Sequence, residues 1–93
     1  MKIYMIGNKE EENCYQNFKR YEDDLTAKGH IVINPLKIIN ALPIGVNNSD
    51  YVVISTSLIR ISDAVFYIPG YEKSLIASLE KGNAIRQDKK VFE

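Results

Sequence analysis

The chain has 93 residues, of which 45% are hydrophobic and 26% charged, and this composition is typical of one ordinary globular domain. Twelve basic and twelve acidic residues cancel, which excludes the basic footprint of a protein that binds nucleic acid polymers. No apolar stretch approaches the roughly 20 residues that cross a bilayer, and no signal peptide is visible, so we expect no membrane contact and a cytoplasmic location.

Cysteine and histidine are too few for a disulfide or a zinc site. Cys14 is the single cysteine and His30 the single histidine. An unpaired cysteine fits a reducing compartment, and one thiol with one imidazole cannot complete a zinc coordination shell. We therefore expect neither a metal nor a cofactor.

The chain opens on a strand followed by a helix. Residues 2–6 form a nearly continuous apolar run that ends at Gly7 and Asn8, which is typical of a buried parallel strand and its turn. Asn13 is a candidate N-cap for the amphipathic helix that follows, and Gly29 is placed to close that helix.

A second strand and an irregular segment come next. Residues 30–34 are rich in β-branched side chains and stop at Pro35, which predicts a strand. Residues 36–48 are too apolar for a free loop but are interrupted by proline, glycine and asparagine. We expect a packed connection without a long regular element.

The following segment carries two competing signals. Residues 51–54 have strand propensity, yet Ile54, Leu58 and Ile61 lie at i, i+4 and i+7. Residues 49–50 are available as helix caps. The spacing favours a helix.

The last third of the chain predicts strand, turn, helix and strand. Asp63 precedes an apolar run, residues 64–68, that we expect to be buried on both faces. The turn at residues 69–70 leads into a helix that should run to about Gln87, which leaves residues 91–92 for a fourth strand.

The alternation of strands and helices predicts the fold. We expect a single α/β domain over residues 1–93, with a three-layer open sheet of about four parallel strands and right-handed crossovers, flavodoxin-like or Rossmann-like. Open sheets of this kind bind ligands beyond the carboxyl ends of their strands. The turn after residue 68 is therefore the first place to look for chemistry.

Glu80 is the most unusual carboxylate near that turn. Two apolar arcs of the helical wheel flank it, one formed by Leu75, Ile76 and Leu79 and the other by Ala77 and Ala84. The pattern alone leaves open whether Glu80 is a functional acid or an ordinary boundary residue. Asp63 is more simply a turn residue, and Ser74 is either an N-cap or part of an anion site at the helix start.

Four motifs follow one another along the whole chain. They are Lys2-Ile-Tyr-Met-Ile-Gly-Asn8, the set Leu25, Gly29, His30, Val32, Asn34 and Pro35, the triplet Asp63-Ala-Val65, and Pro69-Gly-Tyr-Glu-Lys-Ser-Leu-Ile-Ala-Ser-Leu-Glu80. Together they resemble the small nucleoside 2-deoxyribosyltransferase-like proteins, in particular a compact phage and bacterial branch long carried as a domain of unknown function.

The resemblance implies an activity on a small-molecule nucleotide or nucleoside. Glu80 matches the glutamate that attacks the anomeric carbon in this family and releases the nucleobase, as the carboxylate of a retaining glycosidase does. Ser74 matches a phosphate-contacting serine six residues before that glutamate. The candidate substrate-binding residues are Gly7, Asn8, Asp63, Gly70, Tyr71 and Ser74.

Three departures from the family pattern leave a second function open. Ile76 replaces a glycine, Asn8 replaces a proline, and Ser55 stands where relatives carry an acid. General acid–base help is typically worth roughly 10²- to 10⁴-fold in rate. The alternative is therefore a non-catalytic module that senses or sequesters a nucleotide, and a third reading is a self-associating scaffold without a ligand.

Self-association is expected in every reading. A 93-residue sheet protein has a small core. The last helix and the apolar residues near Leu58 offer more apolar surface than one sheet face needs. We expect a homodimer or a larger homo-oligomer.

Overall fold

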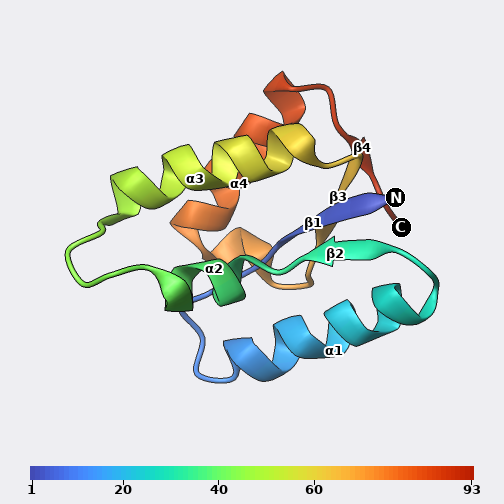
Figure 1. Cartoon of the computed structure of the whole chain (residues 1–93), viewed down its shortest axis with the longest axis horizontal. Coiled ribbons are helices and arrows are strands. Elements are labelled where there is room, and N and C mark those ends of the chain that lie inside the picture. Colours follow the sequence, from blue (N-terminus) through green and yellow to red (C-terminus); the bar gives the residue numbers. More distant parts are fainter.

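A computed structural model describes all 93 residues and contains four helices, one 3₁₀ turn and four strands (Figure 1). In chain order these are β1 (Lys2–Ile6), α1 (Cys14–Ala27), β2 (Ile31–Ile33), α2 (Pro35–Ala41), α3 (Asn48–Ile61), β3 (Ala64–Tyr67), the 3₁₀ turn η1 (Tyr71–Lys73), α4 (Leu75–Arg86) and β4 (Lys90–Val91). The strands form one parallel sheet in the order β2-β1-β3-β4. This order is flavodoxin-like, and it confirms the predicted three-layer α/β fold.

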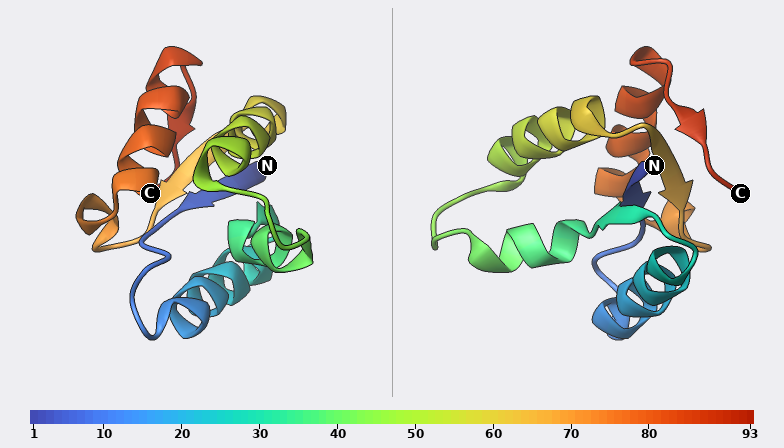
Figure 2. Two further views of the ribbon diagram at one scale, coloured as in Figure 1. Left: turned by 90° about the vertical axis from the view of Figure 1, so that its left-hand side faces the viewer. Right: turned by 45° about the vertical axis from the view of Figure 1, so that its right-hand side comes forward.

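Helices cover both faces of the sheet because the side chains of β1 alternate between them. Ile3 and Met5 pack with α1 and with Leu36 of α2, whereas Tyr4 and Ile6 pack against α3 and α4. Figure 2 shows α1 on one side of the sheet and α3 with α4 on the other. These four side chains are fully buried, as expected for an inner strand of a doubly covered sheet, and only Lys2 at the start of β1 is exposed.

Gly7 ends β1 at a point where there is no room for a side chain. A Cβ atom there would lie 2.8 Å from Cζ of Phe18 and 2.9 Å from Cδ1 of Ile68. Gly7 therefore lets α1 and Ile68, the residue after β3, pack closely against the end of the first strand. Its glycine is explained by packing, without any ligand.

Residues 35–41 form the helix α2 where the sequence predicts only an irregular connection. Oδ1 of Asn34 accepts a hydrogen bond from the backbone N–H of Leu36 at 3.0 Å, which makes Asn34 an N-cap. Pro35 occupies the first helical position, where its fixed φ and missing N–H are tolerated. The Asn-Pro pair that ends β2 therefore also begins α2.

The predicted helix over residues 51–61 is confirmed as α3, but its caps differ from the prediction. The cap is Asn47, whose side chain accepts from the N–H of Asp50 at 2.9 Å, while Asp50 accepts from the N–H of Asn47 at 3.2 Å. This reciprocal pair is a capping box. Of the predicted cap residues 49–50, only Asp50 takes part.

The remaining boundaries agree with the sequence to within a few residues. Asn13 is the N-cap of α1 but makes no side-chain capping bond, and Gly29 follows α1 with a φ of 90°. Of the predicted strand residues 64–68, Ala64, Val65 and Ile68 are buried, so the expected burial on both faces holds in part. None of the helices combines the length and the apolar character needed to cross a membrane.

Candidate functional site

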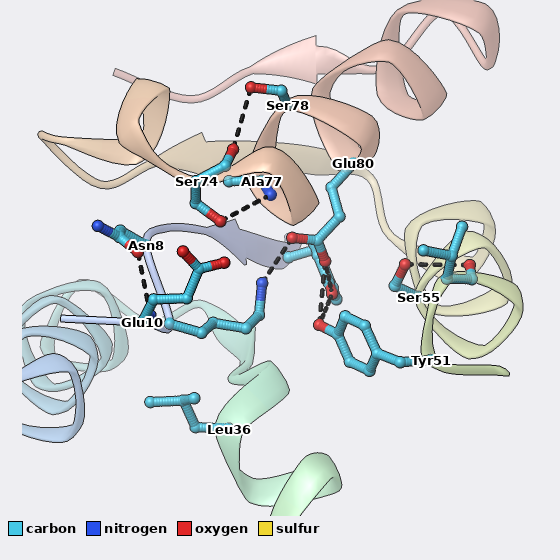
Figure 3. A network of polar contacts seen from close by, with 12 residues as sticks. Asn8, Glu10, Leu36, Tyr51, Ser55, Ser74, Ala77, Ser78 and Glu80 are labelled. Atoms are coloured by element: carbon cyan, nitrogen blue, oxygen red, sulfur yellow. Dashed lines mark hydrogen bonds and ion pairs between the residues drawn. The ribbon is translucent and has the colours of Figure 1, made fainter. Parts of the chain in front are cut away.

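Glu80 points from α4 into the protein, toward Tyr51 of α3 (Figure 3). The inward face of α4 carries two small residues, Ala77 and Ala84, and these let the helix approach the sheet closely enough to bury the acid. Glu80 is 1% exposed. A buried carboxylate needs hydrogen-bond donors around it, because desolvation of a charge is otherwise prohibitive.

Three side chains supply those donors. Nζ of Lys9 lies 2.6 Å from Oε1 of Glu80, and the hydroxyl of Tyr51 donates to Oε2 at 3.1 Å. The hydroxyl of Tyr4, from β1, also donates to Oε2. The two tyrosine oxygens lie 3.1 Å apart. Both oxygens of Glu80 are therefore occupied, one by two neutral donors and the other by a cation.

The two tyrosines are held in their protonated form. Burial, and then the negative charge of Glu80, raise the pKa of Tyr4 well above its ordinary value of 10. The same two causes raise the pKa of Tyr51. At neutral pH both hydroxyls keep their protons and act as fixed donors to the carboxylate.

A cavity of about 330 Å³ lies beside this cluster. Its wall is formed by Lys9 and Glu10 after β1, by α2 and the segment that follows it, by the start of α3 with Tyr51, and by Ile76 of α4. This volume is at the lower end of the range of small-molecule sites. Lys9 and Tyr51 belong both to the wall and to the partners of Glu80, whereas Glu80 itself is not part of the wall.

Ser74 is an N-cap of α4. Its Oγ accepts a hydrogen bond from the N–H of Ala77 at 3.2 Å, and the residue is 1% exposed. Ser74 does not line the cavity, but Ile76 does. The side chain that replaces the glycine of the resembling family therefore forms part of the cavity wall.

The other predicted substrate-binding residues do not line the cavity either. Asn8 shapes the loop after β1, where its Oδ1 accepts from the N–H of Glu10 at 3.0 Å. Gly70 adopts a φ of 93° in the turn before η1. Tyr71 packs on Tyr67, with ring centroids 4.8 Å apart, and its hydroxyl accepts from Lys81 at 3.1 Å.

Asp63 lies at the opposite end of the sheet from this cluster. Its Oδ2 accepts a hydrogen bond from the N–H of Lys2, the first residue of β1, at 2.7 Å. That hydrogen bond is the main reason that the pKa of Asp63 is lowered. Asp63 joins β1 to the start of β3, and the structure does not bring it together with Glu80.

Ser55 is fully buried on α3, one turn after Tyr51, and its hydroxyl donates to the backbone carbonyl of Val52 at 3.1 Å. A helix-bonded hydroxyl thus occupies the position where the resembling family carries an acid. The carboxylate that does line the cavity is Glu10, from a different element. No group of three or more histidine, cysteine, aspartate or glutamate side chains is placed to hold a metal ion.

The sequence does not identify the partners of Glu80. Tyr4 and Tyr51 sit in apolar runs and are typical core residues by periodicity, and Lys9 begins a charged segment typical of an exposed loop. One signal could have identified them. A buried acid needs hydrogen-bond donors, and a tyrosine in an otherwise apolar helix or strand can donate one from inside the core.

The arrangement combines a buried carboxylate, two fixed neutral donors, one cation and an adjoining cavity. Comparison with curated proteins and comparison with solved structures each found no significant match. One protein family matches, over residues 1–93, so the strands, the cavity and Glu80 all lie within the matched region. The chain belongs to the family described as Domain of unknown function (DUF4406).

Proposed function

We propose that this protein cleaves or transfers the N-glycosidic bond of a nucleotide or deoxynucleoside, with Glu80 as the nucleophile. The observation that carries the proposal is the setting of Glu80: a carboxylate 1% exposed, held by three donors and separated from a cavity of about 330 Å³ by two of them. The four motifs that resemble the deoxyribosyltransferase-like family support the same role.

The reaction would take place in two steps at one carbon atom. An electron pair of Oε1 of Glu80 forms a bond to the anomeric carbon while the carbon–nitrogen bond breaks, and the base leaves with that bonding pair and takes a proton from water. Water, or the nitrogen of a second base, then attacks the same carbon, gives up its proton to the hydroxide left by the first step, and returns the bonding pair to Glu80. Hydrolysis consumes one water molecule in total.

The hydroxyls of Tyr4 and Tyr51 support Oε1 as the attacking atom. Both donate to Oε2, from a strand and from a helix that are packed together. They fix the plane of the carboxylate and satisfy one oxygen throughout the reaction. We assign them as positioning residues, since preorganised donors cost no rearrangement when the reaction occurs.

A non-catalytic nucleotide-binding module is the second candidate, and one observation favours it. Both oxygens of Glu80 are occupied, and its side chain is completely shielded from solvent. In that arrangement Glu80 would hold the site together without attacking a ligand. For either function we propose the cytoplasm as the location, because the buried Cys14 is unpaired, as is usual in a reducing compartment.

A nucleotide panel separates the two candidates. Wild type and the Glu80→Gln variant are incubated with nucleoside monophosphates and deoxynucleosides, base release is followed by chromatography, and binding is followed by calorimetry. We expect release by the wild type and a loss of at least about 10³-fold in the variant, since the nucleophile is removed.

The matched control is Glu22→Gln. Glu22 also pairs with a lysine at 2.6 Å, but it lies on α1, away from the cavity. This variant should release base at the wild-type rate. Tight binding without release by the wild type would favour the binding module, and the absence of both release and binding would leave only a scaffold.

A further inference from the structure

Lys9 covers the one oxygen of Glu80 that the tyrosines leave free. Its Nζ lies 2.6 Å from Oε1, and the side chains of Lys9 and Glu80 are 10% and 0% exposed. The same ammonium lies 5.3 Å from the centroid of the Tyr51 ring, at a distance typical of a cation–π contact. In this arrangement Oε1 cannot come within reach of a substrate carbon.

Lys9 is also the only cation in the wall of the cavity. The remaining wall is apolar or uncharged except for the carboxylate of Glu10. An anionic group that entered the cavity would therefore have Lys9 as its single charged partner there. Lys9 would attract this anionic group, and the negative charge of Glu10 would repel it.

Of the three partners of Glu80, Lys9 is the one able to move. Tyr4 is fixed in the central strand and Tyr51 in α3, and both rings are buried. Lys9 lies in the segment between β1 and α1, and its charge is carried on a flexible four-carbon stem.

A ligand can displace Lys9 only if it offers the ammonium a better partner than Glu80. A ligand shifts a conformational equilibrium by its difference in affinity for the two states and by no more. A neutral sugar offers no charge to replace a buried carboxylate. A phosphate offers three acceptor oxygens and the required charge.

We propose that Lys9 is a movable counter-ion, which covers Glu80 in the free protein and turns to a phosphate group of the ligand when the ligand enters the cavity. The turn uncovers Oε1. This role for Oε1 rests on the proposed function, but the exchange of Lys9 between two anions does not depend on bond cleavage. Because of Lys9, an anionic ligand uncovers Oε1 of Glu80 and a neutral ligand does not.

Calorimetry with 2-deoxyribose 5-phosphate tests the exchange without any catalytic step. The Glu80→Gln variant removes the competitor for Lys9, so it should bind the sugar phosphate about tenfold more tightly than the wild type does. The Lys9→Met variant should bind it at least about tenfold more weakly. In the double variant the gain from Glu80→Gln should vanish, because no ammonium remains to be released.

Four controls, two ligands and two variants, keep the result specific. Neutral 2-deoxyribose should show none of these changes, and inorganic phosphate tells whether the anion alone is enough. Lys9→Arg retains the charge and should recover sugar phosphate binding to within a few-fold. Lys37→Met breaks an ion pair of the same 2.6 Å length outside the cavity and should leave binding unchanged.

Several outcomes would overturn the proposal. One is that Lys9→Met weakens the binding of 2-deoxyribose and of 2-deoxyribose 5-phosphate equally, and that Lys9→Arg does not restore it. A lysine with a purely structural role would give this result. Another is a Glu80→Gln variant that binds the sugar phosphate no more tightly than the wild type, or fails to bind it at millimolar concentration. A wild type that never releases base, yet shows the predicted order of affinities, would contradict the proposed function and leave the exchange intact.

Discussion

Glu80 is kept inside the protein by side chains that come from three places in the chain. Tyr4 lies on β1, Lys9 follows β1, and Tyr51 lies on α3. Removing one partner of a buried charge is costly because the remaining group stays desolvated. The cluster is therefore expected to contribute to the stability of the fold as well as forming a candidate site. This contribution to the free energy of unfolding can be measured without an activity assay.

The stability of the wild type should fall in alkali because of Tyr51. Its pKa is raised in the folded protein, so the folded state holds a proton that the unfolded state begins to lose near pH 10. The resulting contribution is complete below pH 10 and declines above it, by up to about 1.4 kcal/mol per pH unit.

Tyr51→Phe tests this directly by urea unfolding followed by circular dichroism. At pH 7 the variant should be less stable by about 1.5–3 kcal/mol, the value of a hydrogen bond to a charged group. Between pH 10 and pH 11 this difference should shrink, because the variant lacks the titrating hydroxyl. A difference that stays constant with pH would show that the hydroxyl is not held protonated by the fold.

At the residue scale the sequence predicts the acid but not its surroundings. Glu80 stands out because it falls between two apolar arcs of one helix. Its partners are up to 76 positions away, and nothing local distinguishes Tyr4 or Tyr51 from core aromatics. Only the packing of α3 and α4 against β1 brings them together.

At the scale of single elements, the start of α4 shows how a cap and a binding residue can be confused. The hydroxyl of Ser74 caps the N–H of Ala77 and is buried away from the cavity wall. A serine at this point therefore has a sufficient structural reason to be there. A phosphate contact is not needed to explain it.

Ser74→Ala should destabilise the protein by about 0.5–2 kcal/mol, the usual value of a helix N-cap. Ser78→Ala is the matched control, because Ser78 lies on the same helix and only donates to the carbonyl of Ser74. It should change stability by less than about 0.5 kcal/mol. Below the unfolding transition, affinity for 2-deoxyribose 5-phosphate should stay within twofold in both variants. A selective loss of affinity in Ser74→Ala would instead make Ser74 a phosphate contact.

Elements were predictable where a periodic pattern was long. The spacing of Ile54, Leu58 and Ile61 over about two turns identifies α3 in spite of its β-branched residues. The residues that α3 buries are instead Tyr51, Ser55 and Ile59. The seven residues of α2 are too few to establish a period, and their start signal, Asn34-Pro35, is also the end signal of a strand. For this reason the sequence does not predict the part of the cavity wall that α2 forms.

At the scale of the whole molecule, α4 has two opposite faces with different tasks. Its inner face carries Glu80, and its outer face exposes apolar side chains: Leu75 is 72% exposed and Ile85 64%. Leu79, which is 46% exposed, lies on the same outer face. We propose that this face pairs with the same face of a second copy.

Size-exclusion chromatography with light scattering should therefore give a dimer for the wild type. Leu79→Lys should shift it to monomer, because it places a charge in the centre of the apolar face. Ile31→Lys is the control: Ile31 is also exposed, but it lies on β2 at the opposite edge of the sheet from β4. A wild type that is purely monomeric at micromolar concentration would contradict the pairing.

The parallel arrangement of the strands with helices between them is the most predictable feature of the whole molecule. Four apolar runs separated by helical segments allow few arrangements once crossovers are right-handed, and the observed order β2-β1-β3-β4 is one of them. The position of the cavity was less predictable. It depends on where α2 and the segment after it lie beyond the strand ends, and no pattern in residues 36–48 indicates this.

Intact-protein mass spectrometry during base release tests most directly whether Glu80 forms a covalent bond to a sugar. The wild type, quenched during turnover of its substrate, should gain the mass of one glycosyl group, and peptide mapping should place that group on Glu80. The Glu80→Gln variant should gain none. Base release by the wild type with no adduct on Glu80, or at an equal rate in the variant, would show that Glu80 is not the nucleophile.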